Sequence, residues 1–215
     1  MISIYTGTPG SGKTLHAAAD IRYALTKPRG ADQPVIANFS VNTSEVTRPG
    51  AFVYVDNQDL TPDFLTRYAD DFWSSTDRPF TEDYLLLVID ECSIIFNARS
   101  WMSKGRAGRN DSRMDWLEFM SQHRKYGYRI ILIAQSSKMI DNQFRMLIDD
   151  EVNHRKVDGM GMVGAFVGTV LRHRLFMRVH YLYQTHERLG MRLYFARRSH
   201  MAMYDSYVRL QKVTA

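Results

Sequence analysis

The sequence predicts an α/β fold, with a mostly parallel central sheet covered by helices on both faces and a basic, β-rich C-terminal extension. Three observations support this prediction. Short apolar runs alternate with segments of helical periodicity over the first 150 residues, as in chains whose parallel strands are joined by helices. Residues 84–89 (YLLLVI) are apolar throughout, which is typical of a strand buried on both faces. Beyond Val152 the pattern becomes β-like.

Each predicted element rests on its own pattern. Strands are expected at short apolar runs, namely residues 2–5, 35–39, 52–55, 84–89 and 129–134. Helices are expected where apolar residues recur every three or four positions. They are from Thr14 toward Pro28, over residues 60–73, around residues 116–123 with Gly127 as the stop, and in a helix capped by Ser136 or Ser137 that continues to Ile148. Residues 175–183 and 191–196 are expected to form antiparallel strands.

The composition is that of an ordinary globular protein of medium size. The chain has 215 residues, of which 45% are hydrophobic and 24% are charged. Its single cysteine, Cys92, excludes an internal disulfide and is typical of a reducing compartment. The longest uncharged apolar run, residues 159–171, is shorter than the roughly 20 residues of a membrane span, and no signal-peptide pattern is visible. The sequence therefore predicts a soluble chain.

Charge is distributed unevenly along the chain. Residues 1–154 carry 17 Lys and Arg against 20 Asp and Glu, whereas residues 155–215 carry 11 against 3. The positive excess of the C-terminal part is either a solvated surface or a surface for an anionic partner, such as nucleic acid or the cytoplasmic face of a membrane. We expect a core over residues 1–155 and a basic extension over residues 156–215, within one compact unit.

Residues 7–14 (GTPGSGKT) match the pattern G-x-x-x-x-G-K-[ST] between a predicted strand and a predicted helix. Glycines let such a loop curl so that its backbone N–H groups point at phosphate oxygens, and the helix dipole favours the same anion. Lys13 would bridge the β- and γ-phosphates, and the Thr14 hydroxyl would bind Mg²⁺. The sequence therefore predicts a P-loop site for ATP and Mg²⁺, formed by Gly7, Thr8, Pro9, Gly10, Ser11, Gly12, Lys13 and Thr14.

Two acidic residues, Asp90 and Glu91, follow the apolar strand at residues 84–89. A carboxylate at the C-terminal end of a buried parallel strand lies beside the phosphate loop in folds of this class. Asp90 is expected to bind Mg²⁺, and Glu91 to act as the general base that deprotonates the attacking water. Because a kinase must keep water away from the γ-phosphate, this pair favours hydrolysis over transfer to a small acceptor. We therefore expect the core over residues 1–155 to be a P-loop ATPase.

Other candidates are less specific. Gln135 ends the next predicted strand and could contact the γ-phosphate or the attacking water; a surface glutamine is the alternative. The polar loop at residues 99–113 carries several arginines, one of which could reach a neighbouring subunit's site in a ring. A solvated loop is the alternative there. His123 lies on the apolar stripe of its helix and is expected to be a packed core histidine.

Three segments carry a resemblance to a known family: residues 2–18 (ISIYTGTPGSGKTLHAA), 85–91 (LLLVIDE) and 123–135 (HRKYGYRIILIAQ). They are similar to the zonular occludens toxin-like family, the filamentous-phage assembly ATPases also called gene I proteins. Trp101 and residues 141–147 look similar but are less diagnostic. The resemblance covers residues 1 to about 155 well and the basic extension only loosely.

The resemblance implies an ATP-hydrolysing motor for assembly and extrusion of filamentous phage at the cytoplasmic face of the bacterial inner membrane. It also implies a homo-oligomer that acts with phage coat and assembly proteins, with the phage single-stranded DNA complex and, through its basic C-terminal region, with the inner-membrane surface. Family members are anchored by a span after this domain, so we expect the chain to be the cytoplasmic portion. The alternatives are a DNA-translocating or packaging ATPase that acts directly on single-stranded DNA, and a secreted toxin or interaction module.

Overall fold

The structure, a computed structural model, describes residues 1–26, 33–45, 52–97, 112–157, 175–196 and 198–203. These residues form a sheet of eight strands in the order β3-β2-β4-β5-β1-β6-β7-β8. Neighbouring strands from β3 to β6 are parallel, and β7 and β8 are added antiparallel at one end. The predicted mostly parallel sheet is therefore confirmed. The strands are β1 (Ile2–Thr6), β2 (Val35–Ala37), β3 (Phe52–Tyr54), β4 (Leu85–Ile89), β5 (Tyr128–Ile133), β6 (Asp150–Lys156), β7 (Leu175–Leu182) and β8 (Arg188–Phe195).

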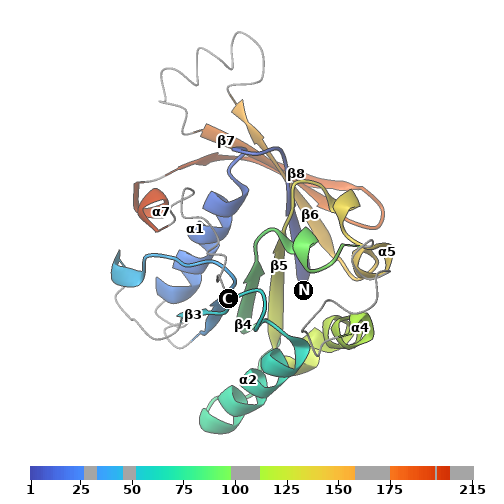
Figure 1. The fold of residues 1–215 in the computed structure, drawn as a ribbon. Coiled ribbons are helices and arrows are strands. Elements are labelled where there is room, and N and C mark those ends of the chain that lie inside the picture. Colours follow the sequence, from blue (N-terminus) through green and yellow to red (C-terminus); the bar gives the residue numbers. More distant parts are fainter. Residues whose placement is uncertain (27–32, 46–51, 98–111, 158–174, 197, 204–215) are drawn as a thin grey trace, which may run out of the picture.

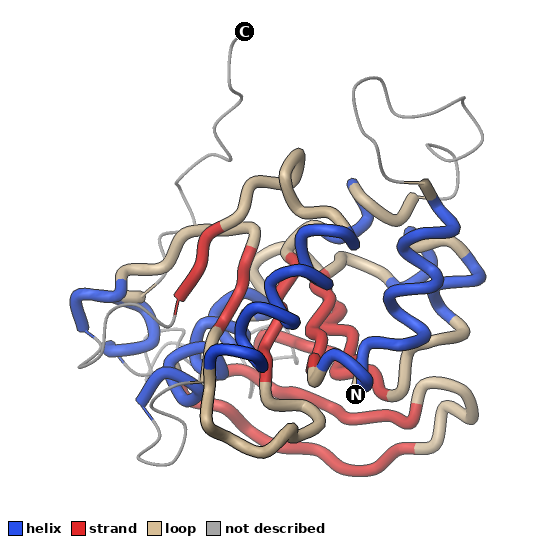
Figure 2. Tube along the Cα trace, turned by 90° about the horizontal axis from the view of Figure 1, so that it is seen from below, coloured by secondary structure: helices blue, strands red, loops and turns tan. Residues whose placement is uncertain are grey.

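Helices lie on both faces of this sheet (Figure 1). On the face of α1 and α7, Ile21 and Met203 belong to one apolar cluster. On the face of α2, α4 and α5, a larger cluster includes Leu65, Trp116 and Phe144. Figure 2 shows the β7–β8 hairpin as two long strands along one edge of the molecule. The helices are α1 (Lys13–Thr26), α2 (Pro62–Ser75), α4 (Arg113–Gln122), α5 (Asn142–Arg145) and α7 (Arg198–Ala202).

Local sequence explains where the longer helices begin and end. Thr61 caps α2 by accepting a hydrogen bond from Phe64 N at 3.1 Å, and a proline in the first turn removes an N–H that would have no helical partner. Ser112 and Asp115 form a capping box at the start of α4. Gly127 ends the 3₁₀ turn that follows α4, with a left-handed φ of 79°, as the sequence predicts.

The order of the central strands determines which residues meet at one edge of the sheet. β5 lies between β1, which precedes the phosphate loop, and β4, which precedes Asp90 and Glu91. These three strands are parallel, so their C-terminal ends point the same way. β1 and β4 are buried at every position, as apolar runs covered on both faces predict. The same edge therefore carries Gly7, Asp90 and Gln135.

The prediction of a single helix from Ser136 or Ser137 to Ile148 is wrong. The segment forms a 3₁₀ turn, Ser137–Met139, and then the short helix α5. Between them, Ile140 has an extended backbone and a buried side chain, and Asp141 caps α5 by accepting from Gln143 N at 2.9 Å. Burial of Ile140 and the local cap therefore outweigh the helical spacing of the apolar residues.

Strand β6 joins the parallel part of the sheet to the hairpin. It pairs with β1 in parallel and with β7 in antiparallel orientation. No sequence pattern predicts its full length, because most of its residues are polar and only Val152 and His154 are buried. Some predicted features lie outside the described residues: most of the arginine-bearing loop at residues 99–113, Trp101, and the apolar run at residues 159–171.

Candidate nucleotide-binding site

Residues 7–14 join β1 to α1 and form its first turn. Gly7, Gly10 and Gly12 have positive φ values of 142°, 74° and 91°, which residues with a Cβ atom rarely adopt. The loop closes on itself through a hydrogen bond from Ser11 N to Thr8 O at 3.1 Å. Thr8, Pro9 and Gly10 are exposed, whereas Ser11 is buried and its Oγ has no hydrogen-bond partner within the described part of the chain. The predicted motif therefore folds into a curled loop with an accessible tip.

Lys13 begins α1 and turns its side chain back into this loop. Its Nζ donates to Gly7 O at 2.8 Å and to Thr8 O at 3.1 Å. Burial lowers the pKa of the ammonium group, and the negative charges of Glu91 and Asp90 oppose that shift. The ammonium group thus lies on the concave side of the loop, where a phosphate oxygen would replace a carbonyl oxygen as its partner.

Thr14, at the end of the phosphate loop, is in direct contact with Asp90, which follows β4. Thr14 Oγ1 donates to Asp90 Oδ2 at 3.0 Å. Burial raises the pKa of the Asp90 carboxyl group, and hydrogen bonds from Glu91 N and Thr14 oppose the shift. A hydroxyl and a carboxylate are oxygen ligands of the kind that Mg²⁺ prefers, usually with water and phosphate completing the shell. The pair therefore fits the metal that the motif implies.

Asn38 holds the backbone of Asp90, a role that sequence analysis missed. Its Oδ1 accepts from Asp90 N at 2.7 Å, and its Nδ2 donates to Asp90 O at 2.8 Å. Asn38 is buried and directly follows β2, which pairs with β4. The sequence feature that points to Asn38 is a polar residue near the end of a predicted strand, at the edge of the sheet where the acidic pair is expected.

Glu91 has a left-handed backbone, with φ 47° and ψ 42°. This conformation costs a residue other than glycine about 1–2 kcal/mol. Its N–H donates to Asp90 Oδ1 at 2.8 Å, which fixes the two acidic residues relative to each other. Backbone strain that persists in a folded chain is found preferentially at functional positions, so the conformation supports Glu91 as a candidate.

Gln135 meets the phosphate loop through its backbone. Gly7 N donates to Gln135 O at 3.3 Å, and the Gln135 side chain is exposed. Because β5 lies between β1 and β4, Gln135 stands between the loop and the acidic pair. This is where a side chain that senses the γ-phosphate would have to be.

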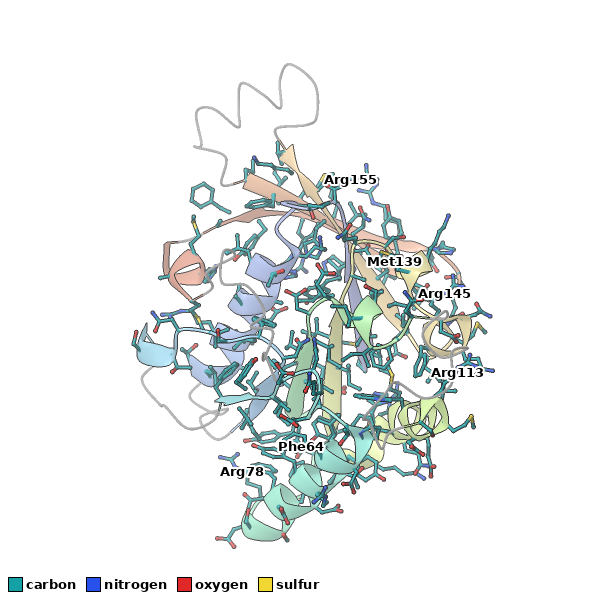
Figure 3. The ribbon with its side chains drawn as sticks, in the orientation of Figure 1. Phe64, Arg78, Arg113, Met139, Arg145 and Arg155 are labelled. Carbon is teal, nitrogen blue, oxygen red and sulfur yellow. The ribbon has the colours of Figure 1, made fainter. Side chains whose placement is uncertain are left out.

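Arg113, His123 and Cys92 occupy structural positions. Arg113 donates to Asp141 Oδ1 at 2.6 Å on the α4 and α5 side of the molecule (Figure 3). His123 is buried, and its Nδ1 lies 2.7 Å from Met120 O. Cys92 is a free, buried thiol whose pKa is raised by burial. The other arginines of the loop lie outside the part that the structure describes.

A comparison with protein families decides the relationship of the chain. The family model described as zonular occludens toxin (Zot) matches residues 1–211. The chain belongs to the Zot family. Among relatives of this Zot-family chain, the Gene 1 protein of Escherichia phage If1 is 26% identical over 185 residues, which are 79% of this chain and 45% of that protein. The Gene 1 protein of Enterobacteria phage M13 is 28% identical over 181 residues, which are 77% and 44% of the two chains. The Zot-family chain therefore spans about half the length of these relatives.

Solved structures give the fold of the Zot-family chain. The N-terminal domain of zonular occludens toxin from Neisseria meningitidis superposes with a TM-score of 0.56 at 17% identity, covering 95% of this chain and 98% of that one. The genome-packaging NTPase B204 of Sulfolobus turreted icosahedral virus 2, in complex with AMPPCP, superposes with a TM-score of 0.51 at 13% identity, covering 90% and 96%. The fold is thus that of a P-loop NTPase. Among the described residues, no helix has the length and apolar character needed to cross a membrane.

Proposed function

We propose that this chain is the ATP-hydrolysing unit of a motor that assembles and extrudes filamentous phage at the cytoplasmic face of the bacterial inner membrane. The contact between Thr14 and Asp90 carries the proposal, because it joins the phosphate loop to the acidic strand in a relative of phage Gene 1 proteins. The strained Glu91 next to Asp90 adds the group that hydrolysis requires and that transfer to a small acceptor does not.

In the proposed reaction, Lys13 and the N–H groups of the loop bind the β- and γ-phosphates of ATP. Thr14 and Asp90 would hold Mg²⁺, which supplies positive charge against the oxygens of the transferred phosphoryl group. Glu91 accepts the proton of the attacking water, so the hydroxyl attacks the γ-phosphorus and ADP leaves. Gln135 contacts the γ-phosphate or the water from the end of β5.

The proposed partners follow from the relatives and from charge. A homo-oligomer would bring cationic groups of a neighbouring subunit to the γ-phosphate. The phage coat and assembly proteins, and the phage single-stranded DNA complex, would be the objects on which the motor acts. The basic C-terminal region, with exposed arginines such as Arg188 and Arg192, would approach the anionic inner leaflet.

The proposal is tested by measuring ATP hydrolysis by the purified chain with Mg²⁺ over a range of protein concentrations. Lys13→Ala should abolish nucleotide binding. Glu91→Gln should keep binding but lower kcat at least about 100-fold, the smallest effect typical of removing a general base. Lys125→Ala and Glu118→Gln are the matched controls, because both residues are exposed, Lys125 precedes β5 at the end of the strand opposite to the loop, and Glu118 lies in α4.

Specific activity that rises with concentration would support an oligomeric motor. Hydrolysis that survives Lys13→Ala would contradict the proposed site. Strong stimulation by single-stranded DNA, with binding that weakens steeply as salt increases, would favour a motor that acts on nucleic acid directly. If anionic liposomes at low salt leave the chain unbound, the basic region needs a partner other than the membrane.

A further inference from the structure

The phosphate loop is packed against two strands that lie outside the nucleotide-binding motif. A Cβ atom added to Gly7 would lie 2.4 Å from the backbone oxygen of His154 in β6. A Cβ atom added to Gly12 would lie 2.8 Å from Cδ1 of Phe176 in β7. Both distances are too short for real Cβ atoms, so each end of the loop is in close contact with one of these strands.

A chain of directed hydrogen bonds joins the same elements beneath the loop. Arg178 of β7 contacts Nε2 of His16 in α1. Because a guanidinium group only donates, His16 Nε2 accepts, and His16 Nδ1 therefore carries the proton that it donates to His154 Nε2 at 2.9 Å. His154 Nδ1 in turn donates to Thr6 O at 3.2 Å, directly before the loop. Each of these hydrogen bonds has a fixed direction. Together they link β7 to the first turns of α1 and to the end of β1.

Phe176 adds an apolar contact between β7 and the phosphate loop. Its ring meets Gly12, the residue before Lys13, through three ring carbons within 3.1 Å of the position of an added Cβ atom. The backbone at Gly12 can therefore move toward β7 only if the Phe176 ring moves as well. The ring is partly exposed, so no other described element encloses it completely.

We propose that Phe176 is a positioning residue for the phosphate loop, and that through it the β7–β8 hairpin responds to occupation of the nucleotide site. This inference rests on the proposed nucleotide binding. Phe176 does not touch the reacting atoms in this proposal; its ring limits the backbone positions of Gly12, and so the direction in which the N–H groups of the loop point. Binding of a phosphate chain then orders β7 as well as the loop.

Hydrogen exchange of the unmodified chain tests the response of the hairpin. With the non-hydrolysable analogue AMPPCP and Mg²⁺, the backbone amides of β7 should exchange at least about threefold more slowly than without it, while those of β3, at the opposite end of the sheet, should be unchanged. Phe176→Ala should abolish the slowing in β7. If the analogue binds and β7 exchanges at the same rate with and without it, the inference is overturned while the proposed function stands.

Kinetics of variants test the positioning role. Phe176→Ala should raise KM for ATP about tenfold and change kcat less, and Phe176→Leu, which keeps an apolar contact, should recover most of the loss. Phe195→Ala is the matched control, since Phe195 lies in the same hairpin on the opposite face and is 47% exposed. Equal KM values for all these variants would overturn the inference. If the unmodified chain neither binds nor hydrolyses ATP, the proposed function and this inference fall together.

Discussion

The parallel half of the sheet and the β7–β8 hairpin differ in what covers them. β1 and β4 are buried at every position, because helices from the crossover connections lie on both faces. In β8, by contrast, Met191, Leu193 and Phe195 point to one face and are 52%, 62% and 47% exposed. The opposite face of the hairpin packs toward α1 through Phe176 and Arg178. One face of the hairpin therefore lies next to the site. On the other face these β8 side chains are exposed, whereas Met177 and Val179 of β7 are buried.

Truncation of one leucine in each region should give the largest contrast. Leu87→Ala in β4 should lower the free energy of unfolding by about 2–5 kcal/mol, because Leu87 is fully buried and a cavity would remain. Leu193→Ala in β8 should change it by less than about 0.5 kcal/mol, since its side chain is mostly solvated. Urea denaturation of both variants measures the difference. Similar losses of unfolding free energy in the two variants would mean that the face of the hairpin that carries Leu193 is covered in solution.

Substitution of two glycines of the loop should distinguish the cost of a clash with β6 from the cost of backbone strain alone. Gly7→Ala places a Cβ atom against the backbone of His154 at a positive φ, and should cost about 2–4 kcal/mol in unfolding free energy. Gly10→Ala is also strained by its φ of 74° but has no atom within 4 Å, so it should cost only about 1–2 kcal/mol. Thermal unfolding of the two variants makes the comparison, and equal losses would argue against tight packing of the loop on β6.

The junction between the two regions should also respond to pH. Burial lowers the pKa of His154 to about 3, with the neighbouring His16 contributing. Below the ordinary value of about 6.5, the unfolded chain binds a proton that the folded chain does not bind until about pH 3. As the pH falls from 6.5 to 3, His154 should therefore lower the unfolding free energy by up to about 1.4 kcal/mol for each pH unit.

This effect is measured by urea denaturation at pH 7, 6, 5 and 4. His154→Asn should make the decline with falling pH shallower, while lowering stability at pH 7 through loss of its hydrogen bonds to Thr6 O and His16. A decline of the same slope in the variant would show that other groups determine the acid sensitivity.

Local signals in the sequence predict the parallel half well and its long-range pairings poorly. The apolar run of β4, the glycine-rich loop and the stop at Gly127 each depend on residues close in sequence, and the structure has them where expected. The contacts of Asn38 with Asp90 and of Phe176 with Gly12 join residues far apart in the chain, which no local pattern encodes. The assignment of Lys13, Glu91 and Gln135 to catalysis stays a prediction.

The position of β1 has a consequence for biosynthesis. This strand precedes the other seven strands of the sheet in the sequence, yet its two neighbours are β5 and β6, which end at Ile133 and Lys156. At 5–20 residues per second, about 8 to 30 s pass before the ribosome has produced both neighbours. The phosphate loop is therefore synthesised well before β6 and β7, the strands on which it packs. A nascent chain released before β6 would carry the complete motif but lack the strand on which its first glycine packs.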